Sequence, residues 1–397
     1  MSTLRSLPRN VWVLSLTSFL RDVASEMLVH LLPLFLANVL SVRTGVIGLI
    51  EGIAETTSSL MKIYSGWLSD KWGKRKNLTV AGYGLAALAT PLLLVARSWP
   101  GVLLFRFLDR LGKGIRTAPR DALITDSVHP DQRGISFGLH RAADSAGAFV
   151  GLLLAMVIVW RSQANAILLN EETFRKVVTW ALVPSFLAVL VVALGVREIA
   201  RQRTAEAPHL TLSGFEPRFL RFLVVIVLFT LGNSTDAFLI LRAQTAGSSV
   251  VMVLAMLALF NLIYALLSAP VGALSDRVDR RLVIVGGWLL YALVYLGFAG
   301  ASQTWQFWLL YAAYGAYYAL TEGVAKAFLA DVVPGERRGT AYGVYNAAIG
   351  LTALPASVLA GVLWQGVGGW TGLGPAAPFL FGGSLALVAA VLLWRWV

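Results

Sequence analysis

Three titratable side chains near the beginning of this sequence lie at helical spacing. Asp22, Glu26 and His30 are each four residues apart, so a helix would carry them on one face. A carboxylate held away from water can take up and release a proton near neutral pH, and we expect this of Asp22 and Glu26. His140 and Asp144 repeat the spacing, and we expect the same proton chemistry of Asp144.

The same side chains permit two other chemistries. Oxygen and nitrogen ligands suit manganese, iron(II), cobalt or zinc, and such a metal site would consist of Asp22, Glu26 and His30. His140 beside Asp144 could act as a general base in an enzyme. The sequence has no HExxH motif or phosphate-binding loop, so we expect neither an enzyme nor a cofactor.

Composition indicates that membrane-spanning helices position these residues. Of the 397 residues, 57% are hydrophobic and 14% are charged, and the mean hydropathy is +0.71, which is more apolar than water-soluble proteins of this length. Apolar runs of about 20 residues, enough to cross a bilayer as a helix, recur throughout. We predict an all-α integral membrane protein with twelve spans: 11–40, 44–69, 78–97, 101–126, 134–160, 176–196, 220–243, 249–274, 282–301, 305–331, 340–364 and 376–396.

The net charge of +12 reflects membrane topology more readily than nucleic-acid binding. Basic residues between the spans concentrate in the segments that a cytoplasm-first topology places inside, as they do in cytoplasmic loops generally. We therefore predict an inner-membrane protein with both termini in the cytoplasm and no nucleic-acid partner. The first span lacks a small-residue cleavage site, which favours a retained helix. With no cysteine in the chain, disulfides are excluded.

Internal similarity divides the spans into two halves. GWLSDKWGKRKNL from Gly66 recurs as GALSDRVDRRLVI from Gly272, and DSVHPDQRGISFG from Asp126 recurs as DVVPGERRGTAYG from Asp331. Two matches at nearly the same offset indicate a duplicated six-helix unit. The predicted domains are two pseudo-symmetric six-helix bundles, residues 1–196 and 220–397, joined by a cytoplasmic linker, residues 197–219.

Charged residues inside the spans mark a candidate polar cavity. The stretch RFLDRLGKGIRTAPRD, residues 106–121, places its basic side chains three or four residues apart. A charge facing lipid at mid-membrane costs about 2.5–3.5 kcal/mol, so we expect carboxylates of the first, second and fifth spans to compensate this stretch. The candidate cavity residues are Arg110, Glu55, His140, Arg141, Asp236, Glu322 and Lys326, with Tyr314 and Tyr317 as aromatic lining.

Three motifs carry a family resemblance. They are a loop signature of Gly, Asp, a basic residue, Gly and two basic residues, a fourth-span motif and a fifth-span glycine pair: Gly66, Asp70, Gly73, Lys74 and Arg75; Arg106, Gly112 and Gly114; Gly147 and Gly151. With these motifs the chain resembles the major facilitator superfamily over its full length, nearest to the multidrug and sugar-efflux-like branch of proton antiporters. Ala148, where antiporters usually carry proline, and Asp279, in place of the second loop's glycine, depart from the pattern.

The loop signature predicts a conformational latch. A carboxylate there can cap a helix N-terminus or pair with an arginine of a neighbouring helix, and we expect such contacts to break when the halves rock. The expected latch residues are Gly66, Asp70, Gly73, Arg75, Arg106, Asp276 and Arg280.

The resemblance implies a monomeric secondary active transporter that moves a small molecule or ion across the lipid bilayer by alternating access. We expect coupling to protons and export. The charge of the substrate stays open, because the basic fourth span favours an anion or zwitterion whereas Asp22, Glu26 and Glu322 favour a cation. Two alternatives also stay open: export of a divalent metal, and uptake of an anionic solute by symport or facilitated diffusion.

Overall fold

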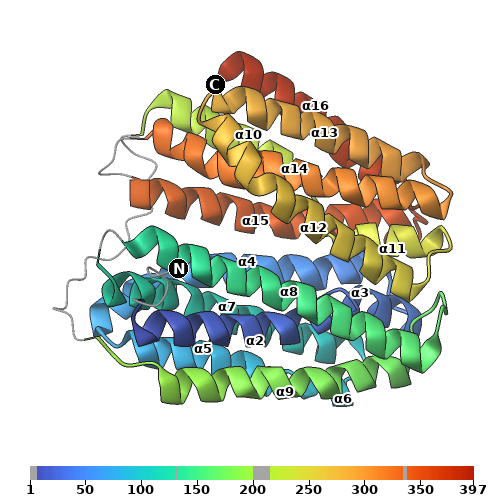
Figure 1. Cartoon of the computed structure of the whole chain (residues 1–397). Coiled ribbons are helices and arrows are strands. Elements are labelled where there is room, and N and C mark those ends of the chain that lie inside the picture. Colours follow the sequence, from blue (N-terminus) through green and yellow to red (C-terminus); the bar gives the residue numbers. More distant parts are fainter. Residues whose placement is uncertain (1–6, 130–131, 200–214, 334–337) are drawn as a thin grey trace. The chain divides into compact units, whose positions relative to one another are not determined.

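The computed structural model describes residues 7–129, 132–199, 215–333 and 338–397, apart from the side chains of residues 70, 133–134, 330 and 338–339. All regular elements in these ranges are helices (Figure 1). They are α2 (Arg9–Val29), α3 (Leu32–Leu34), a π-helical turn (Phe35–Val39), α4 (Thr44–Trp72), α5 (Arg75–Ala89), α6 (Leu92–Val95), α7 (Trp99–Ser127), α8 (Arg133–Gln163), α9 (Glu171–Gly195), α10 (Pro217–Gly232), α11 (Ala237–Thr245), α12 (Val250–Ser275), α13 (Arg280–Gly300), α14 (Thr304–Asp331), α15 (Arg338–Gln365) and α16 (Ala377–Trp396).

The chain forms two compact units. The first comprises residues 1–40, 57–164 and 169–208, and the second comprises residues 41–56, 165–168 and 209–397. Helix α4 thus belongs to the second unit up to Thr56 and to the first unit from Thr57. The predicted bundle boundaries stay a proposal, and most of the predicted linker lies outside the described residues.

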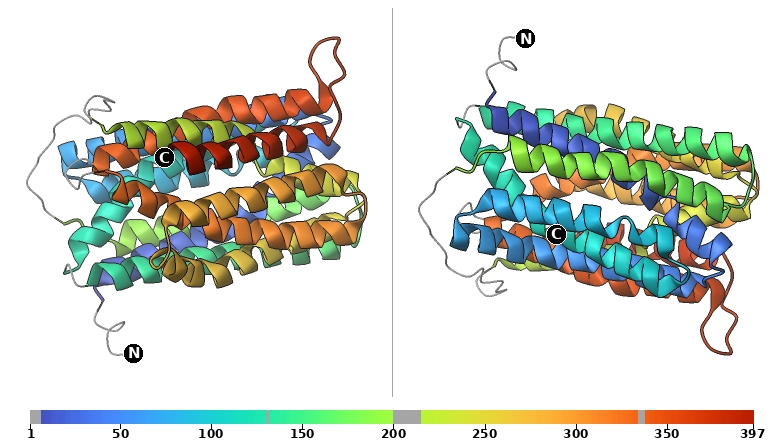
Figure 2. Two further views of the ribbon diagram at one scale, coloured as in Figure 1. Left: turned by 90° about the horizontal axis from the view of Figure 1, so that it is seen from above. Right: turned by 90° about the horizontal axis from the view of Figure 1, so that it is seen from below.

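Helices of the first unit pack along their lengths. Helix α2 lies against α8 and α9, and α5 lies against α7 (Figure 2). A Cβ added to Gly82 would lie 2.6 Å from the carbonyl oxygen of Gly112, and one added to Gly112 would lie 2.5 Å from that of Gly82. Glycine at both positions therefore lets the backbones of α5 and α7 touch, as small residues do in membrane helix pairs.

Helices of the second unit also pack along one another. Helix α13 lies against α14 and α16, α12 lies against α14, and α10 lies against α15 and α16. The hydroxyl of Thr44 donates a hydrogen bond of 3.0 Å to the carbonyl of Gly361, and that of Thr56 donates one of 2.5 Å to the carbonyl of Gly350. These bonds fix the beginning of α4 on α15.

One predicted span contains a break. The span expected at 220–243 is two helices, because α10 ends at Gly232 and α11 begins at Ala237. The residues between them are Asn, Ser, Thr and Asp, whose short polar side chains bond nearby backbone groups and so compete with helix formation. The break places Asp236 at the N-terminus of α11.

The helices suit a bilayer. Among the described residues, nine segments are long and apolar enough to cross a membrane. Helices α4, α7 and α14 are not among them, although each has 28 or 29 residues, because charged side chains in α4 and α7 and mostly uncharged polar ones in α14 make them less apolar. The number of twelve spans therefore stays a prediction. Leu88, Leu194 and Leu293 are 69%, 73% and 67% exposed, as expected of side chains that face lipid.

Candidate functional site

A buried ion pair joins three helices of the first unit. A guanidinium nitrogen of Arg21, on α2, contacts the carboxylate of Asp109, on α7. A second nitrogen of Arg21 donates a hydrogen bond of 2.8 Å to the hydroxyl of Ser185, on α9. Both charged side chains are at most 6% exposed. Arg106 and Arg110 each approach the other oxygen of Asp109 at 3.9 Å, so Asp109 is held as a carboxylate by three guanidinium groups.

The two α2 carboxylates predicted to carry a proton have different surroundings. Glu26 Oε2 lies 2.8 Å from His30 Nε2, one helical turn away. Asp22 is half-buried, and within the described part of the chain it forms no hydrogen bond or ion pair. It interacts electrostatically with Asp144 and Glu26, of like charge, and with Lys113 and Arg116, of opposite charge. Of the two carboxylates on α2, Asp22 is therefore the one whose charge is not fixed by a direct bond in the described structure.

The predicted pair on α8 is close but not hydrogen-bonded. His140 Nε2 lies 3.7 Å from Asp144 Oδ1, beyond hydrogen-bond length. His140 is 4% exposed, and in the described structure neither of its ring nitrogens has a hydrogen-bond partner. Asp144 is close enough to interact electrostatically with Asp22, so α2 and α8 bring two of the three predicted proton-coupling residues together. Arg141 lies on the exposed side of α8.

Carboxylates of α7 itself balance part of the positive charge on its basic stretch, residues 106–121. Asp109 lies against Arg106 and Arg110, and Asp121 Oδ1 lies 2.9 Å from a nitrogen of Arg120. Neighbouring carboxylates were predicted for this role, and Glu26 of the first span is close enough to act on Arg110. The second-span candidate Glu55 is half-buried in the segment that belongs to the second unit.

The latch residues of the first unit gather around the end of α4. Gly73 has a φ of +63° and its amide donates to the carbonyl of Ser69 at 2.9 Å, a left-handed helix end that favours glycine. Arg75 opens α5 and pairs with Asp126, at the end of α7. The carboxylate of Glu198 accepts hydrogen bonds from the amides of Arg75 and Lys76 at 3.1 and 3.0 Å, and so caps α5.

Two other predicted latch residues, Gly66 and Asp70, lie on α4. A Cβ at Gly66 would meet Ala118 of α7 at 3.4 Å, so Gly66 packs at a helix contact. The side chain of Asp70 lies outside the described residues.

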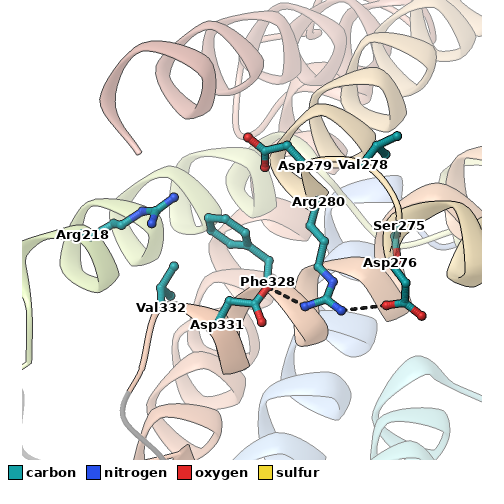
Figure 3. A pocket seen from close by; sticks show the side chains of 9 residues that line it. All are labelled: Arg218, Ser275, Asp276, Val278, Asp279, Arg280, Phe328, Asp331 and Val332. Carbon is teal, nitrogen blue, oxygen red and sulfur yellow. Dashed lines mark hydrogen bonds and ion pairs between the residues drawn. The ribbon is translucent and has the colours of Figure 1, made fainter.

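The latch residues of the second unit form a matching arrangement (Figure 3). Arg280 lies between two carboxylates, with Asp276 at 2.7 Å and Asp331 at 2.5 Å. These side chains line a pocket together with Arg218 and Phe328. The two ion pairs are equivalent, because Arg75 and Asp126 are 51 residues apart and so are Arg280 and Asp331.

The predicted cavity residues of the second unit are held by tyrosines. The hydroxyl of Tyr314 donates to Asp236 Oδ1 at 2.7 Å, and that of Tyr264 donates to Glu322 Oε2 at 2.6 Å. Lys326 Nζ lies 3.3 Å from the other oxygen of Glu322, the pairing that the spacing of four residues allowed. We name this group the tyrosine–carboxylate cluster; its members are Asp236, Phe260, Tyr264, Tyr314, Tyr318 and Glu322.

The geometry lends little support to the metal site and to the lining role of Tyr317 that the sequence suggested. Glu26 and His30 bond each other, but no group of three His, Cys, Asp or Glu side chains in the described ranges is arranged to hold a metal ion. Tyr317, expected as lining, is 5% exposed and packs against Tyr291 with ring centroids 4.8 Å apart, so it belongs to the aromatic core.

Sequence reasoning missed several of these partners. Arg21 lies next to Asp22 in the sequence, and nothing there indicates the buried pair that it forms with Asp109. Glu198 gave no signal because it lies beyond the sixth span, whereas the equal separation of Arg75 and Asp126 in both repeats could have identified that pair. Phe260, Tyr264 and Tyr318 gave no charge signal, since aromatic residues in a membrane span are unremarkable by composition.

Comparisons with known proteins agree with this architecture. A sequence model of the Major Facilitator Superfamily matches residues 14–256 and 221–397. The chain is 35% identical over 395 residues to an uncharacterised MFS-type transporter of Methanocaldococcus jannaschii, covering 98% of this chain and 95% of that protein. It is 34% identical over 143 residues to the multidrug resistance protein MdtH of Aeromonas hydrophila, covering 36% of each chain.

The fold is also that of a solved transporter. The crystal structure of a variant of the nucleoside transporter NupG superposes with a TM-score of 0.80, covering 97% of this chain and 99% of that one, at 14% identity. At that identity the likeness shows the fold and leaves the substrate open.

Proposed function

This chain belongs to the major facilitator superfamily, and from that premise we propose that it exports a small solute in exchange for protons, by alternating access across the inner membrane. It is a multi-pass membrane transporter and not an enzyme. Export is proposed because of the partial similarity to a multidrug resistance protein. A monomer with both termini in the cytoplasm is part of the proposal.

The observation that carries proton coupling is the environment of Asp22. Other acids of the first unit have direct partners: Asp109 contacts Arg21, Asp126 contacts Arg75, and Glu26 bonds His30. Asp22 lies beside Asp144, and two like charges that approach in a poorly hydrated site favour protonation of one of them. A cationic substrate or a proton would each relieve that repulsion, so binding of one would compete with binding of the other.

Glu26, Asp144 and His140 complete the proposed coupling site. Glu26 also acts electrostatically on Asp22, so three carboxylates share the region between α2 and α8. Lys113 and Arg116 of α7 lie close enough to offset part of this negative charge. Because Asp22 faces both signs of charge, its protonation would respond to a solute that enters this region.

The two equivalent ion pairs support the proposed latch. Arg75 ties the beginning of α5 to the end of α7, and Arg280 ties the beginning of α13 to the ends of α12 and α14. We place Arg106 in the buried Asp109 network rather than at these helix ends, since it lies 3.9 Å from Asp109. We therefore propose that Arg106 fixes the position of α7. This helix carries both Asp109 and Asp126, the partner of Arg75.

Proton movement in proteoliposomes tests this function. Full-length protein is reconstituted with an internal pH-sensitive dye, and organic cations, organic anions and divalent metals are added in turn. We expect one solute class to drive a pH change with the wild type and none with Asp22→Asn. The matched control, Glu172→Gln, alters an exposed carboxylate and should leave the pH change intact. Coupling that persists in Asp22→Asn would refute the assignment of Asp22 as proton carrier.

A further inference from the structure

The connection between α15 and α16, residues 366–376, exposes apolar side chains. It is rich in glycine and contains no charged residue. Val367, Trp370 and Leu373 are 63%, 43% and 69% exposed. We name residues 367–373 the apolar tip. Large apolar side chains gathered on one exposed turn mark a surface that meets an apolar partner.

Backbone hydrogen bonds hold this connection in a defined shape. The amide of Leu373 donates to the carbonyl of Leu363 at 2.8 Å, so the returning chain caps the last turn of α15. Within the apolar tip, the amide of Trp370 donates to the carbonyl of Val367 at 3.1 Å and closes a turn. The exposed side chains therefore stand on an ordered turn.

Glycine is required where the two ends of the apolar tip meet. Gly366 and Gly372 have φ angles of +72° and +77°, which side-chain-bearing residues rarely adopt. A Cβ added to Gly372 would lie 2.5 Å from the amide nitrogen of Gly366. A side chain at Gly372 would therefore strain the backbone and force the ends of the tip apart.

The connection projects across the axes of the helices that it joins. Helices α15 and α16 each contain a segment long and apolar enough to cross a bilayer, so their connection lies where they leave it. Figure 2 shows this connection projecting sideways from the ends of α15 and α16. A segment that leaves membrane-spanning helices in this direction runs along the membrane surface.

An apolar face of α16 begins directly after the connection. Leu380, in the first turn of α16, is exposed, and so are Leu387 and Val391. Their spacing places all three on one face of the helix, as expected of side chains that meet lipid. The apolar tip is therefore continuous in sequence with a surface that already faces the bilayer.

From these observations we propose that the connection between α15 and α16 is a membrane-surface anchor, whose apolar tip inserts into the headgroup region of the leaflet that it faces. Tryptophan suits this region because its ring is apolar and its N–H can reach water. A second copy of the chain fits less well, since three side chains offer far less than the roughly 1,200–2,000 Å² that a stable protein interface buries. The anchor goes beyond the proposed exchange of solute and protons, and in the proposed orientation it lies in the outer leaflet.

Spin labels on single cysteines test the anchor, because the chain has no native cysteine. Val367→Cys, Trp370→Cys and Leu373→Cys are each labelled in full-length protein, in nanodiscs of phosphatidylcholine and phosphatidylglycerol that hold one copy. We expect oxygen, which concentrates in the bilayer, to relax these labels more strongly than a water-soluble nickel chelate does. The control is Ser302→Cys, exposed in the connection between α13 and α14 at the same end of the second unit (Figure 1), where the chelate should dominate.

The outcome is decided by the three tip positions together. Oxygen dominance at two or more of them supports insertion, and chelate dominance at two or more would overturn the anchor. Because each nanodisc holds one copy, a tip that is covered only by a second copy would also give chelate dominance.

Two glycine variants test whether the fixed turn produces the insertion. In the Val367→Cys protein we expect Gly372→Ala to abolish the oxygen preference, because the tip can no longer close. Gly369→Ala should retain it, since a Cβ at Gly369 meets nothing within 4 Å. Thermal unfolding midpoints verify that both variants are folded, and the three tip labels decide the proposal if Gly372→Ala is not. Equal oxygen preference in the two variants would refute the role of the glycine turn.

Discussion

Two aspartates of the first unit show how surroundings set the role of a residue. Asp109 on α7 is surrounded by Arg21, Arg106 and Arg110, so its charge is permanent and its contribution is structural. Asp22 on α2 has no such direct partner in the described structure. The spacing of charges in the sequence does not distinguish a structural aspartate from a proton-carrying one. The distinction depends on which arginine reaches which acid across helices.

Loss of the buried carboxylate should unfold the protein more easily. Asp109→Asn leaves Arg21 buried without its counter-charge, and such a loss costs about 3–5 kcal/mol. We expect a marked drop in the thermal unfolding midpoint in detergent. Asp121→Asn is the control, because Asp121 is 42% exposed and its pair with Arg120 is worth about 1 kcal/mol or less. Similar midpoints for the two variants would show that the Asp109 network is not stabilising.

At the scale of the helices, contacts between backbones hold neighbouring elements together. Glycine at 82 and 112 lets α5 and α7 touch, and the same two helices are joined again by Arg75 and Asp126. The loop repeat in the sequence predicted that these helix ends were important. It did not predict the cap from Glu198, because that residue is remote in sequence and its position depends on how α9 returns to α5.

Adding a methyl group tests the contact between α5 and α7. In Gly82→Ala the new Cβ would lie 2.6 Å from the Gly112 oxygen and 2.7 Å from the Cβ of Arg116, so the helices must separate and we expect a lower unfolding midpoint. Gly84→Ala, two residues along the same helix, meets nothing within 4 Å and should stabilise by about 0.5–1 kcal/mol through helix propensity. The reverse order of the two midpoints would contradict this packing.

The repeated ion pairs should differ in strength because they differ in burial. The side chain of Arg75 is 5% exposed and that of Arg280 is 25% exposed, with Asp126 at 17% and Asp331 at 52%. We expect Asp126→Asn to cost about 3 kcal/mol and Asp331→Asn about 1 kcal/mol or less. Unfolding midpoints of the two variants compare the pairs directly. Equal losses would mean that exposure does not control the strength of this repeated pair.

At the scale of the whole molecule, apolar composition and the two sequence repeats predicted an all-helical membrane protein, and the three sequence motifs supplied the resemblance to the superfamily. The break at 233–236 was missed because a hydropathy window averages over four polar residues. The division of α4 between the units was also missed, because it depends on the hydrogen bonds that Thr44 and Thr56 form with α15. Long-range contacts of this kind leave no local pattern in a single sequence.

Membrane topology can be tested because the chain contains no native cysteine. We expect Ser98→Cys, in the exposed connection before α7, to react with a membrane-impermeant maleimide added outside intact cells. Lys74→Cys, at an exposed position within the first loop signature, should react only after the membrane is permeabilised. Labelling of Lys74→Cys in intact cells would reverse the proposed orientation and place the termini outside.

The bond between Thr44 and Gly361 also bears on how the protein is made. It joins residues 317 positions apart, whereas α2 finds its partners α8 and α9 within the first half of the chain. The ribosome therefore delivers the beginning of α4 to the bilayer long before α15 exists. Residues 41–56 must wait for that partner through most of translation, and a nascent chain stalled before α15 would expose an unfinished helix contact to the quality-control proteases of the membrane.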